Sequence, residues 1–473
     1  AHRGKTKLII TLENRFFSLR SAVCFIIEGG IIMFSVVASF LLLHGRAGTA
    51  VVSMGDVVAR ALVITFICQS CMYLLDLYNF RLSQTWGEVL FALAIAIGFV
   101  CVGIGFLSYA IPKFGVAGKM YYLSILIASV FLLLWRILFE IYITRFAPRE
   151  NILIVGTGEV ARQVGEEVRR RKRLGFHLVG FIDAPQAKNS SYGAQAGEIL
   201  GDPAQMDRII QQYDVAKVVV AITERRGEYP VKEMLALRVG GYQVVEWPGF
   251  FEKLSGRIPI DNLAPSFFIF NEGFRKSWIL LSVRRVLSAI TAAVFLVLLL
   301  PVFLVVAIFI KLDSSGPVLY SQIRVGQHNK PIRIYKFRSM RKDAEKNGDA
   351  VWAVENDHRV TKVGHFLRKM RIDELPQLFN VLIGELEFVG PRPERPEFVE
   401  KLQAMIPYYA LRHTVKPGIT GWAQVMYHYG GTIDESKEKL QYDLFYIKNM
   451  SLKLDLLILF HTFKIVLLGR GAR

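Results

Sequence analysis

Asp373 and Glu374 are adjacent carboxylates, and three cations, Arg368, Lys369 and Arg371, come just before them. We expect this segment to be helical, and neighbouring side chains on a helix point in different directions, so the pair is not expected to share a proton. One carboxylate suits a nucleophile and the other a ligand of a divalent metal ion. The cations would keep Asp373 ionised and offset the charge of a phosphate that it approaches. From spacing alone, however, a solvated charged helix face is the favoured interpretation.

Two further basic clusters favour phosphate chemistry. In KFRSM, Lys336 and Arg338 are two residues apart on a predicted strand, so both can reach a phosphate while Phe337 faces the core. In GPRPERP, Arg392 lies between two prolines, which restrict the backbone and hold its guanidinium ready for a phosphate or a uracil edge. Each cluster alone is a weak signal. Together they predict an anionic substrate beside the acidic pair.

The motifs of this region follow one another in a characteristic order: YKFRSM, FLRKMRIDELPQLFNVLIGE, VGPRP and KPGITGWAQV. From about Phe274 to the C-terminus, the sequence resembles the monotopic phosphoglycosyl transferases, bacterial enzymes that make polyprenyl-diphosphate-linked sugars. The whole chain is similar to the large form of this family, the undecaprenyl-phosphate hexose-1-phosphate transferases of exopolysaccharide pathways. In that form, a four-helix bundle and a Rossmann-like domain precede the catalytic domain.

The resemblance implies a transfer in two steps. Asp373 attacks the sugar-bearing phosphate of a UDP-hexose and expels UMP, and undecaprenyl phosphate then attacks the aspartyl-phosphosugar intermediate. Glu374 holds Mg²⁺, while the cations that balance phosphate charge are Lys336, Arg338, Arg368 and Arg392. Arg371 departs from the family pattern, which often has a small hydroxyl residue there. The hexose stays open between glucose and galactose, with N-acetylated sugars less favoured.

Composition indicates a membrane protein. The chain has 473 residues, of which 52% are hydrophobic, and a mean hydropathy of +0.35, which excludes an ordinary soluble enzyme. The net charge of +18 could indicate nucleic-acid binding. In a membrane protein, however, loop Lys and Arg mark cytoplasmic faces and anionic lipid contacts. We therefore expect the partners to be a lipid bilayer and phosphate ligands, with no nucleic acid; the size of the chain would also suit a homodimer.

Four apolar stretches approach or exceed the roughly 20 residues that cross a bilayer: Leu19 to Leu43, Val51 to Leu77, Val89 to Ile111 and Tyr121 to Ile143. They predict a four-helix transmembrane bundle over residues 1–147. The N-terminal tail is basic, so the positive-inside rule predicts that it lies in the cytoplasm. Four crossings then return the chain to the cytoplasm near Arg145. We expect a multi-pass protein of the bacterial inner (cytoplasmic) membrane.

Residues 148–270 alternate short β-rich runs with charged helical stretches, which predicts a parallel α/β domain of Rossmann type. Gly156, Gly158 and Ala161 match G-x-G-x-x-A directly after a strand, and Asp183 ends the next strand. Such glycines allow a nucleotide phosphate to approach a helix N-terminus. A tight strand-to-helix turn needs the same glycines with nothing bound. Nucleotide binding and an empty or regulatory domain therefore stay open.

Residues 271–473 form the predicted catalytic domain, which begins with an apolar stretch at about 284–311 interrupted by Pro301. Proline removes a backbone hydrogen bond and kinks a helix. Both flanks of the stretch are basic, so we expect it to enter the membrane from the cytoplasm, bend and leave on the same side. This re-entrant helix, which the family resemblance also implies, keeps Asp373 on the cytoplasmic face with UDP-sugars.

Two alternatives to the transferase follow from other parts of the sequence. An NAD-dependent nucleotide-sugar dehydratase needs Tyr-x-x-x-Lys on a helix, but the match from Tyr213 to Lys217 lies where a strand is predicted to begin. A non-enzymatic regulator of polysaccharide assembly would leave the cluster around Asp373 without a role. The sequence therefore favours the transferase over both alternatives.

Overall fold

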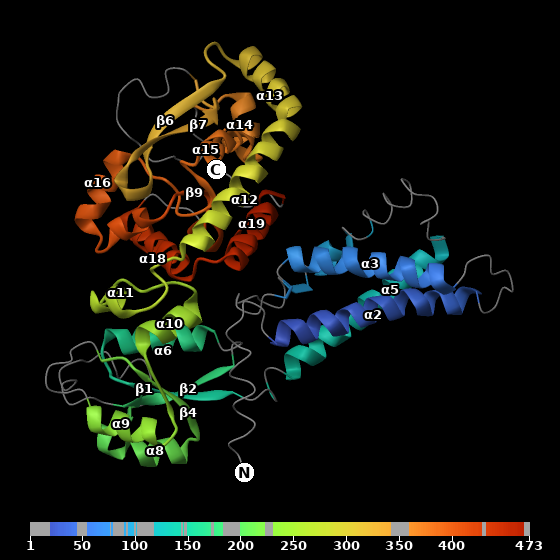
Figure 1. Cartoon of the computed structure of the whole chain (residues 1–473). Helices are drawn as coiled ribbons and strands as arrows, with labels where there is room; N and C mark the ends of the chain where they lie inside the picture. The colour runs from blue at the N-terminus through green and yellow to red at the C-terminus, as the bar shows by residue number, and fades with distance from the viewer. Residues whose placement is uncertain are drawn as a thin grey trace. The chain divides into compact units, whose positions relative to one another are not determined.

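The computed structural model describes residues 19–44, 54–75, 77–78, 89–90, 93–98, 101, 118–142, 145, 149–171, 175–182, 199–222, 230–341, 359–427 and 432–467. The chain divides into two compact units, Ala1–Val244 and Val245–Arg473. The first holds the N-terminal helices and most of the Rossmann-like domain, and the second holds the motif-bearing region. Figure 1 labels the elements of both units, and each unit is described by itself.

The N-terminal helices of the first unit are α2 (Leu19–His44), α3 (Met54–Leu74) and α5 (Gly118–Ile141). Each contains a segment long and apolar enough to cross a membrane, by length and composition. Glu28 of α2 and Arg136 of α5 form a buried ion pair of 2.6 Å, which satisfies both charges inside the bundle. The predicted crossing from Val89 to Ile111 lies mostly outside the described residues, which are helical there at 89–90, 93–98 and 101.

The Rossmann-like domain is built on a five-stranded sheet with the order β3-β2-β1-β4-β5. Its strands are β1 (Glu150–Val155), β2 (Phe176–Ile182), β3 (Ile199–Gly201), β4 (Val215–Val220) and β5 (Gln243–Glu246). The pairs β1–β2, β1–β4 and β2–β3 are parallel. Between them run α6 (Glu159–Arg170), α8 (Met206–Gln212) and α9 (Val231–Val239). The α/β prediction is confirmed for these residues.

The second unit begins with α10 (Trp247–Ser255) and α11 (Ser266–Phe270). Glu252 of α10 accepts hydrogen bonds from Lys448 and Asn449 of α18 (Ile433–Asn449) at 2.6 and 2.8 Å. The indole of Trp422 donates to the carbonyl of Gly256 at 2.9 Å. The segment 245–270, which the sequence analysis grouped with the Rossmann-like domain, therefore packs with the elements that follow it.

The apolar stretch of the second unit is two helices, α12 (Trp278–Leu298) and α13 (Leu300–Asp313). The break falls at Leu299, two residues before Pro301, where the missing N–H of proline ends the hydrogen-bond pattern. The predicted bend is confirmed, and Figure 1 shows it between the two helices. By length and composition α12 alone could cross a membrane, so the helix itself does not decide between crossing and re-entry.

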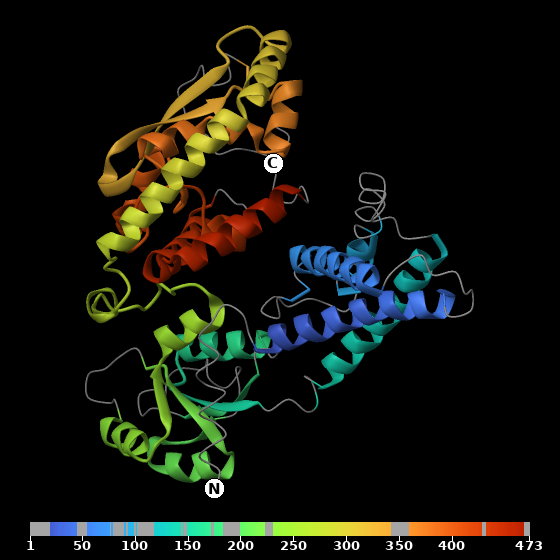
Figure 2. The same ribbon diagram turned by 45° about the vertical axis from the view of Figure 1, so that its right-hand side comes forward.

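A β-hairpin, β6 (Leu319–Val325) and β7 (Pro331–Phe337), lies along α12 and α13 (Figures 1 and 2). Ala292 of α12 packs in one core cluster with Ile332, Ile334 and Val381, and Ile310 of α13 packs in another with Phe337. The outer faces of both helices remain apolar and exposed, as at Val297 and Leu304. One side of this helix pair is therefore packed into the second unit, while the other offers an apolar surface that lipid could cover.

The remaining elements of the second unit follow the hairpin in the sequence. They are α14 (Lys362–Lys369), the 3-10 turn η7 (Ile372–Glu374), α15 (Gln377–Ile383), β8 (Glu387–Val389), α16 (Pro396–Met405), η8 (Tyr409–Thr414), β9 (Gly418–Thr420), α17 (Trp422–Met426), α18 and α19 (Leu452–Leu467). Strands β8 and β9 pair in parallel, which brings the VGPRP and KPGIT motifs together.

Candidate active site

The acidic pair lies on η7, a short 3-10 turn between α14 and α15, and not on the helix that we predicted. The reason is backbone geometry at Arg371, which has φ 57° and ψ 17° in the left-handed region. This conformation ends α14 after Lys369 and turns the chain before Asp373. Both carboxylates are buried as a result, which rules out the solvated charged face.

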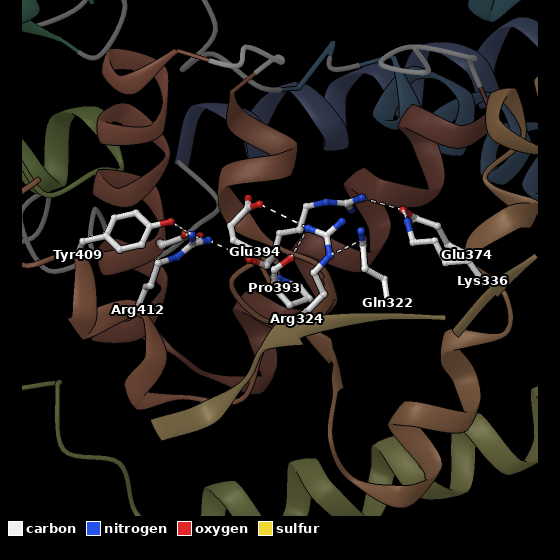
Figure 3. Close-up of polar contacts among 10 residues, drawn as sticks. Gln322, Arg324, Lys336, Glu374, Pro393, Glu394, Tyr409 and Arg412 are labelled. Carbon is white, nitrogen blue, oxygen red and sulfur yellow. Dashed lines mark hydrogen bonds and ion pairs between the residues drawn. The ribbon is translucent and has the colours of Figure 1, made fainter. Parts of the chain in front are cut away.

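Glu374 is the charge centre of the site. Its Oε1 accepts hydrogen bonds from Lys336 Nζ at 3.0 Å and from Arg392 Nη2 at 2.9 Å, and Arg371 Nη1 lies 3.6 Å away. Figure 3 shows Glu374 beside Lys336 of β7. Burial alone would raise the pKa of Glu374, but Lys336, Arg392 and Arg371 together hold it well below its usual range. Glu374 is therefore a buried, ionised carboxylate.

Asp373 has different surroundings. No hydrogen bond or ion pair joins its carboxylate to the residues that the structure describes. Burial and the adjacent charge of Glu374 raise the pKa of Asp373, and Lys336, Arg368 and Arg371 limit that rise. A carboxylate without donors on its oxygens keeps its lone pairs available. The environment therefore separates the two roles, with Asp373 suited to attack and Glu374 suited to hold cations.

The predicted phosphate-binding cations divide into two groups. Lys336 and Arg392 both contact Glu374, the second residue of the acidic pair. Arg368 donates from Nε to the hydroxyl of Ser339 at 2.9 Å, and its charge acts on Asp373. These three cations surround the acidic turn, as the sequence indicated.

Arg338 is placed differently. Its buried guanidinium donates from Nη2 to the carbonyl and hydroxyl oxygens of Ser314, at 2.7 and 2.9 Å, and so anchors the end of α13. Phe337 between Lys336 and Arg338 is buried in the core, as predicted. Nε and Nη1 of Arg338 have no hydrogen-bond partner among the described residues. Substrate binding by Arg338 thus stays a prediction, and its visible role is structural.

The carboxylates also fit a shared metal ion. Mg²⁺ in proteins binds one or two carboxylates together with substrate phosphates. No group of three or more His, Cys, Asp or Glu side chains in the described ranges could hold a metal by itself. Asp373 and Glu374 offer two carboxylates, but Lys336 and Arg392 already contact Oε1 of Glu374. The donor set therefore fits Mg²⁺ only when a phosphate of the substrate completes it.

The glycine motif of the Rossmann-like domain has a structural explanation at its first position. Gly156 has φ +118°, and a Cβ there would lie 2.8 Å from the carbonyl oxygen of Ala221. Gly158 borders open space, so a ligand has room to contact the protein backbone there. The first residue of α6 is Glu159, however, and an acidic residue there disfavours a phosphate. Nucleotide binding stays a prediction, and Asp183 lies outside the described residues.

Tyr213 and Lys217 do not form the site that the dehydratase hypothesis requires. Tyr213 caps the C-terminus of α8, and Lys217 lies within β4, where its Nζ pairs with Glu150 at 3.0 Å. The two side chains do not share a helix face, so they cannot form the Tyr-x-x-x-Lys arrangement.

Sequence analysis did not single out the arginines that bind the backbone around Arg392. Arg412 is buried and donates to the carbonyl oxygen of Arg392 at 3.0 Å. Arg284 and Arg324 belong to the basic flanks of the apolar stretch, and both donate to neighbouring carbonyls. The available signal for Arg412 was its position four residues before the KPGITGWAQV motif.

Two protein-family models match the chain. Residues 279–469 match the family described as bacterial sugar transferase, and residues 73–236 match the family described as CoA-binding domain. The first match contains the whole acidic turn and its cations. The second contains the Rossmann-like sheet up to α9.

Several proteins of known name are similar to the chain. A UDP-N-acetylgalactosamine-undecaprenyl-phosphate N-acetylgalactosaminephosphotransferase of Aeromonas hydrophila is 46% identical over 47% of this chain, which spans 52% of that protein. A UDP-glucose:undecaprenyl-phosphate glucose-1-phosphate transferase of Klebsiella pneumoniae is 35% identical over 66% of this chain and 67% of its own length. An exopolysaccharide production protein of Rhizobium leguminosarum is 40% identical over 38% of this chain and 94% of its own length.

Proposed function

Because the chain belongs to the bacterial sugar transferase family, we propose that it transfers a hexose-1-phosphate from a UDP-sugar to undecaprenyl phosphate. The products are UMP and undecaprenyl-diphospho-sugar, and the step would begin the assembly of a bacterial polysaccharide. The observation that carries the proposal is the contrast within the acidic pair. Glu374 contacts three cations, while Asp373 beside it receives no hydrogen bond on its carboxylate from the described part of the chain.

The proposed reaction has two displacements at one phosphorus atom. A carboxylate oxygen of Asp373 attacks the sugar-bearing phosphate, a P–O bond forms, and the bond to the bridging oxygen breaks with release of UMP. A phosphate oxygen of undecaprenyl phosphate then attacks the same phosphorus, and Asp373 leaves as a free carboxylate. Lys336, Arg392 and Arg368 offset the negative charge that both steps concentrate in the buried site.

Mg²⁺ is part of the proposal, with Glu374 as its protein ligand. The ion would supply Lewis-acid neutralisation of the diphosphate when bound. The Glu374 carboxylate is ionised and holds Lys336 and Arg392 in place, so it orients these cations whether or not a metal is present.

The contacts at the two ends of the α12–α13 pair support a re-entrant path. Arg284 near the start of α12 donates to Asp455 at 2.6 Å, and Arg338 donates to Ser314 just after α13. Both ends thus bind the same compact unit. A crossing would separate them by a hydrocarbon core of about 30 Å. We propose that the pair enters and leaves on the cytoplasmic face, where UDP-sugars are found.

The hexose is not identified. One relative is named for N-acetylgalactosamine and another for glucose, so the comparisons do not favour an unacetylated sugar over an acetylated one. The assay should therefore include acetylated and unacetylated UDP-hexoses.

The test is UMP release by the full chain in lipid nanodiscs, with and without undecaprenyl phosphate. We expect turnover with at least one UDP-sugar, a requirement for the acceptor, and loss of turnover with EDTA that Mg²⁺ restores. We also expect exchange of labelled UMP into the UDP-sugar without acceptor, because the first displacement is reversible. Turnover that needs NAD, or no UMP from any UDP-hexose, would contradict the proposal.

A further inference from the structure

The loop that carries Arg392 has no regular secondary structure, since it connects β8, which ends at Val389, to α16, which begins at Pro396. Its backbone must nevertheless be fixed, because Arg392 Nη2 reaches Glu374 Oε1 at 2.9 Å. The carbonyl oxygens of this loop therefore decide where the guanidinium of Arg392 lies.

Three arginines from distant parts of the sequence bind carbonyls of this loop or of Val389, the last residue of β8. Arg284 of α12 donates to Val389 O at 3.0 Å, Arg324 of β6 to Pro393 O at 3.4 Å, and Arg412 of η8 to Arg392 O at 3.0 Å. Figure 3 shows Arg324 and Arg412 on either side of the loop at Pro393 and Glu394. Of the three, Arg412 binds the residue whose side chain touches Glu374.

Arg412 is itself held from two sides. Its Nη1 donates to the hydroxyl of Tyr409 at 2.6 Å, and its guanidinium carbon lies 5.1 Å from the centre of the Tyr409 ring. Its Nη2 lies 2.9 Å from Asp443 Oδ2 of α18. A planar guanidinium can satisfy a carbonyl, a hydroxyl and a carboxylate at once, whereas an ammonium on a flexible stem cannot hold the same fixed geometry.

We propose that Arg412 is a positioning residue, which fixes the backbone of Arg392 and thereby aims Arg392 at Glu374 and the substrate phosphates. Tyr409 and Asp443 orient Arg412 for this purpose. The inference rests on the proposed function, in which Arg392 balances phosphate charge. Arg412 is buried, so it would act through Arg392 without contacting the substrate itself.

A double-mutant cycle between Arg412 and Arg392 tests this proposal. Arg412→Lys keeps the charge beside Asp443 but loses the planar guanidinium. We expect kcat/KM to fall roughly tenfold to a hundredfold, because small misplacements of charged groups reduce rates by such factors. In an Arg392→Gln background, the same change should cost less than about threefold, because the group that it positions is gone. Rates are normalised to folded protein.

The control is Lys448→Met, which breaks the buried 2.6 Å pair with Glu252 and does not touch the loop. A structural defect of this kind should reduce activity by the same factor in both backgrounds. If Arg412→Lys also gave equal losses in both backgrounds, the positioning role would be refuted. Arg412→Met with Asp443→Asn provides a second, charge-neutral variant of the pair, for which the same dependence on Arg392 is expected.

Binding of UDP provides a readout that does not depend on turnover. Arg412→Lys should weaken UDP binding in the wild-type background and leave it unchanged in the Arg392→Gln background, as measured by calorimetry. Equal weakening in both would overturn the positioning role. Absent turnover by the wild-type chain would instead count against the proposed function, while the binding cycle would still decide the role of Arg412.

Discussion

Replacing Glu374 by Gln should destabilise the second unit while keeping its shape. The side chain is almost isosteric, but three cations lose the charge that holds them together. Lys336 and Arg392 each make a charged hydrogen bond to Oε1. The change therefore tests whether Glu374 is the ionised centre of the site.

The size of the effect follows from these contacts. A hydrogen bond to a charged group contributes about 1.5–3 kcal/mol, so the two bonds contribute roughly 3–6 kcal/mol. The amide oxygen of Gln still accepts from both ionised donors, so part of this energy remains while the attraction between opposite charges is lost. We expect a loss of about 2 kcal/mol, which lowers the Tm of a domain of this size by roughly 4–8 °C.

Thermal unfolding in detergent, followed by tryptophan fluorescence, measures this change, and Trp422 reports from inside the second unit. The matched control is Glu438→Gln, which breaks a more exposed pair with Arg257 at 3.3 Å; such a pair contributes about 0.5 kcal/mol, so Tm should shift by about 2 °C or less. The pKa of Glu374 is lowered in the folded state, so its contribution is present above about pH 4.3 and lost as pH falls below it. The difference in Tm should thus be constant from about pH 5 to 8. Equal Tm values for the Glu374 and Glu438 variants would refute the reasoning.

Three further predictions concern other parts of the chain. Gly156→Ala should cost the Rossmann-like domain about 2 kcal/mol, because φ is +118° and the new Cβ would lie 2.8 Å from a carbonyl oxygen, while UMP release per folded molecule stays unchanged. Burial and a neighbouring arginine lower the pKa of His413 to about 4, so the native state stays neutral while the unfolded state gains a proton below about pH 6.5. As pH falls from about 6.5 to 4, the free energy of unfolding of the wild type should drop by up to about 3 kcal/mol more than that of His413→Gln, as measured by chemical unfolding. Single cysteines at Ser282 and Ser314, in a background without the native cysteines, should both resist an impermeant thiol reagent in intact cells and react in inverted vesicles. Labelling of position 314 from outside would contradict the re-entrant path.

The sequence contained enough information for the architecture and for the chemical groups of the site. Alternating β-rich and helical runs predicted the parallel sheet, and Pro301 predicted the break that the structure has at Leu299. The motifs correctly indicated that Lys336 and Arg392 would meet the acidic pair. These features depend on local composition and short spacing, which a single sequence displays.

Other features depended on contacts between distant residues. Arg338 and Lys336 are two residues apart, yet one anchors Ser314 and the other pairs with Glu374. Spacing gives the face of a strand but not which partner the fold brings to it. The left-handed backbone at Arg371 likewise replaced the predicted helix by a 3-10 turn, and local composition does not predict a conformation that arginine rarely adopts.

Locating the covalent intermediate on the chain tests most directly whether Asp373 is the nucleophile. The full chain is incubated with its UDP-sugar without undecaprenyl phosphate, quenched in acid, digested and analysed by mass spectrometry. We predict one phosphosugar on the peptide that contains Asp373, its disappearance when undecaprenyl phosphate is added, and its absence in the Asp373→Asn variant, whose amide cannot attack. An adduct that persists in Asp373→Asn, or one on another residue, would contradict the assignment of Asp373 as the nucleophile.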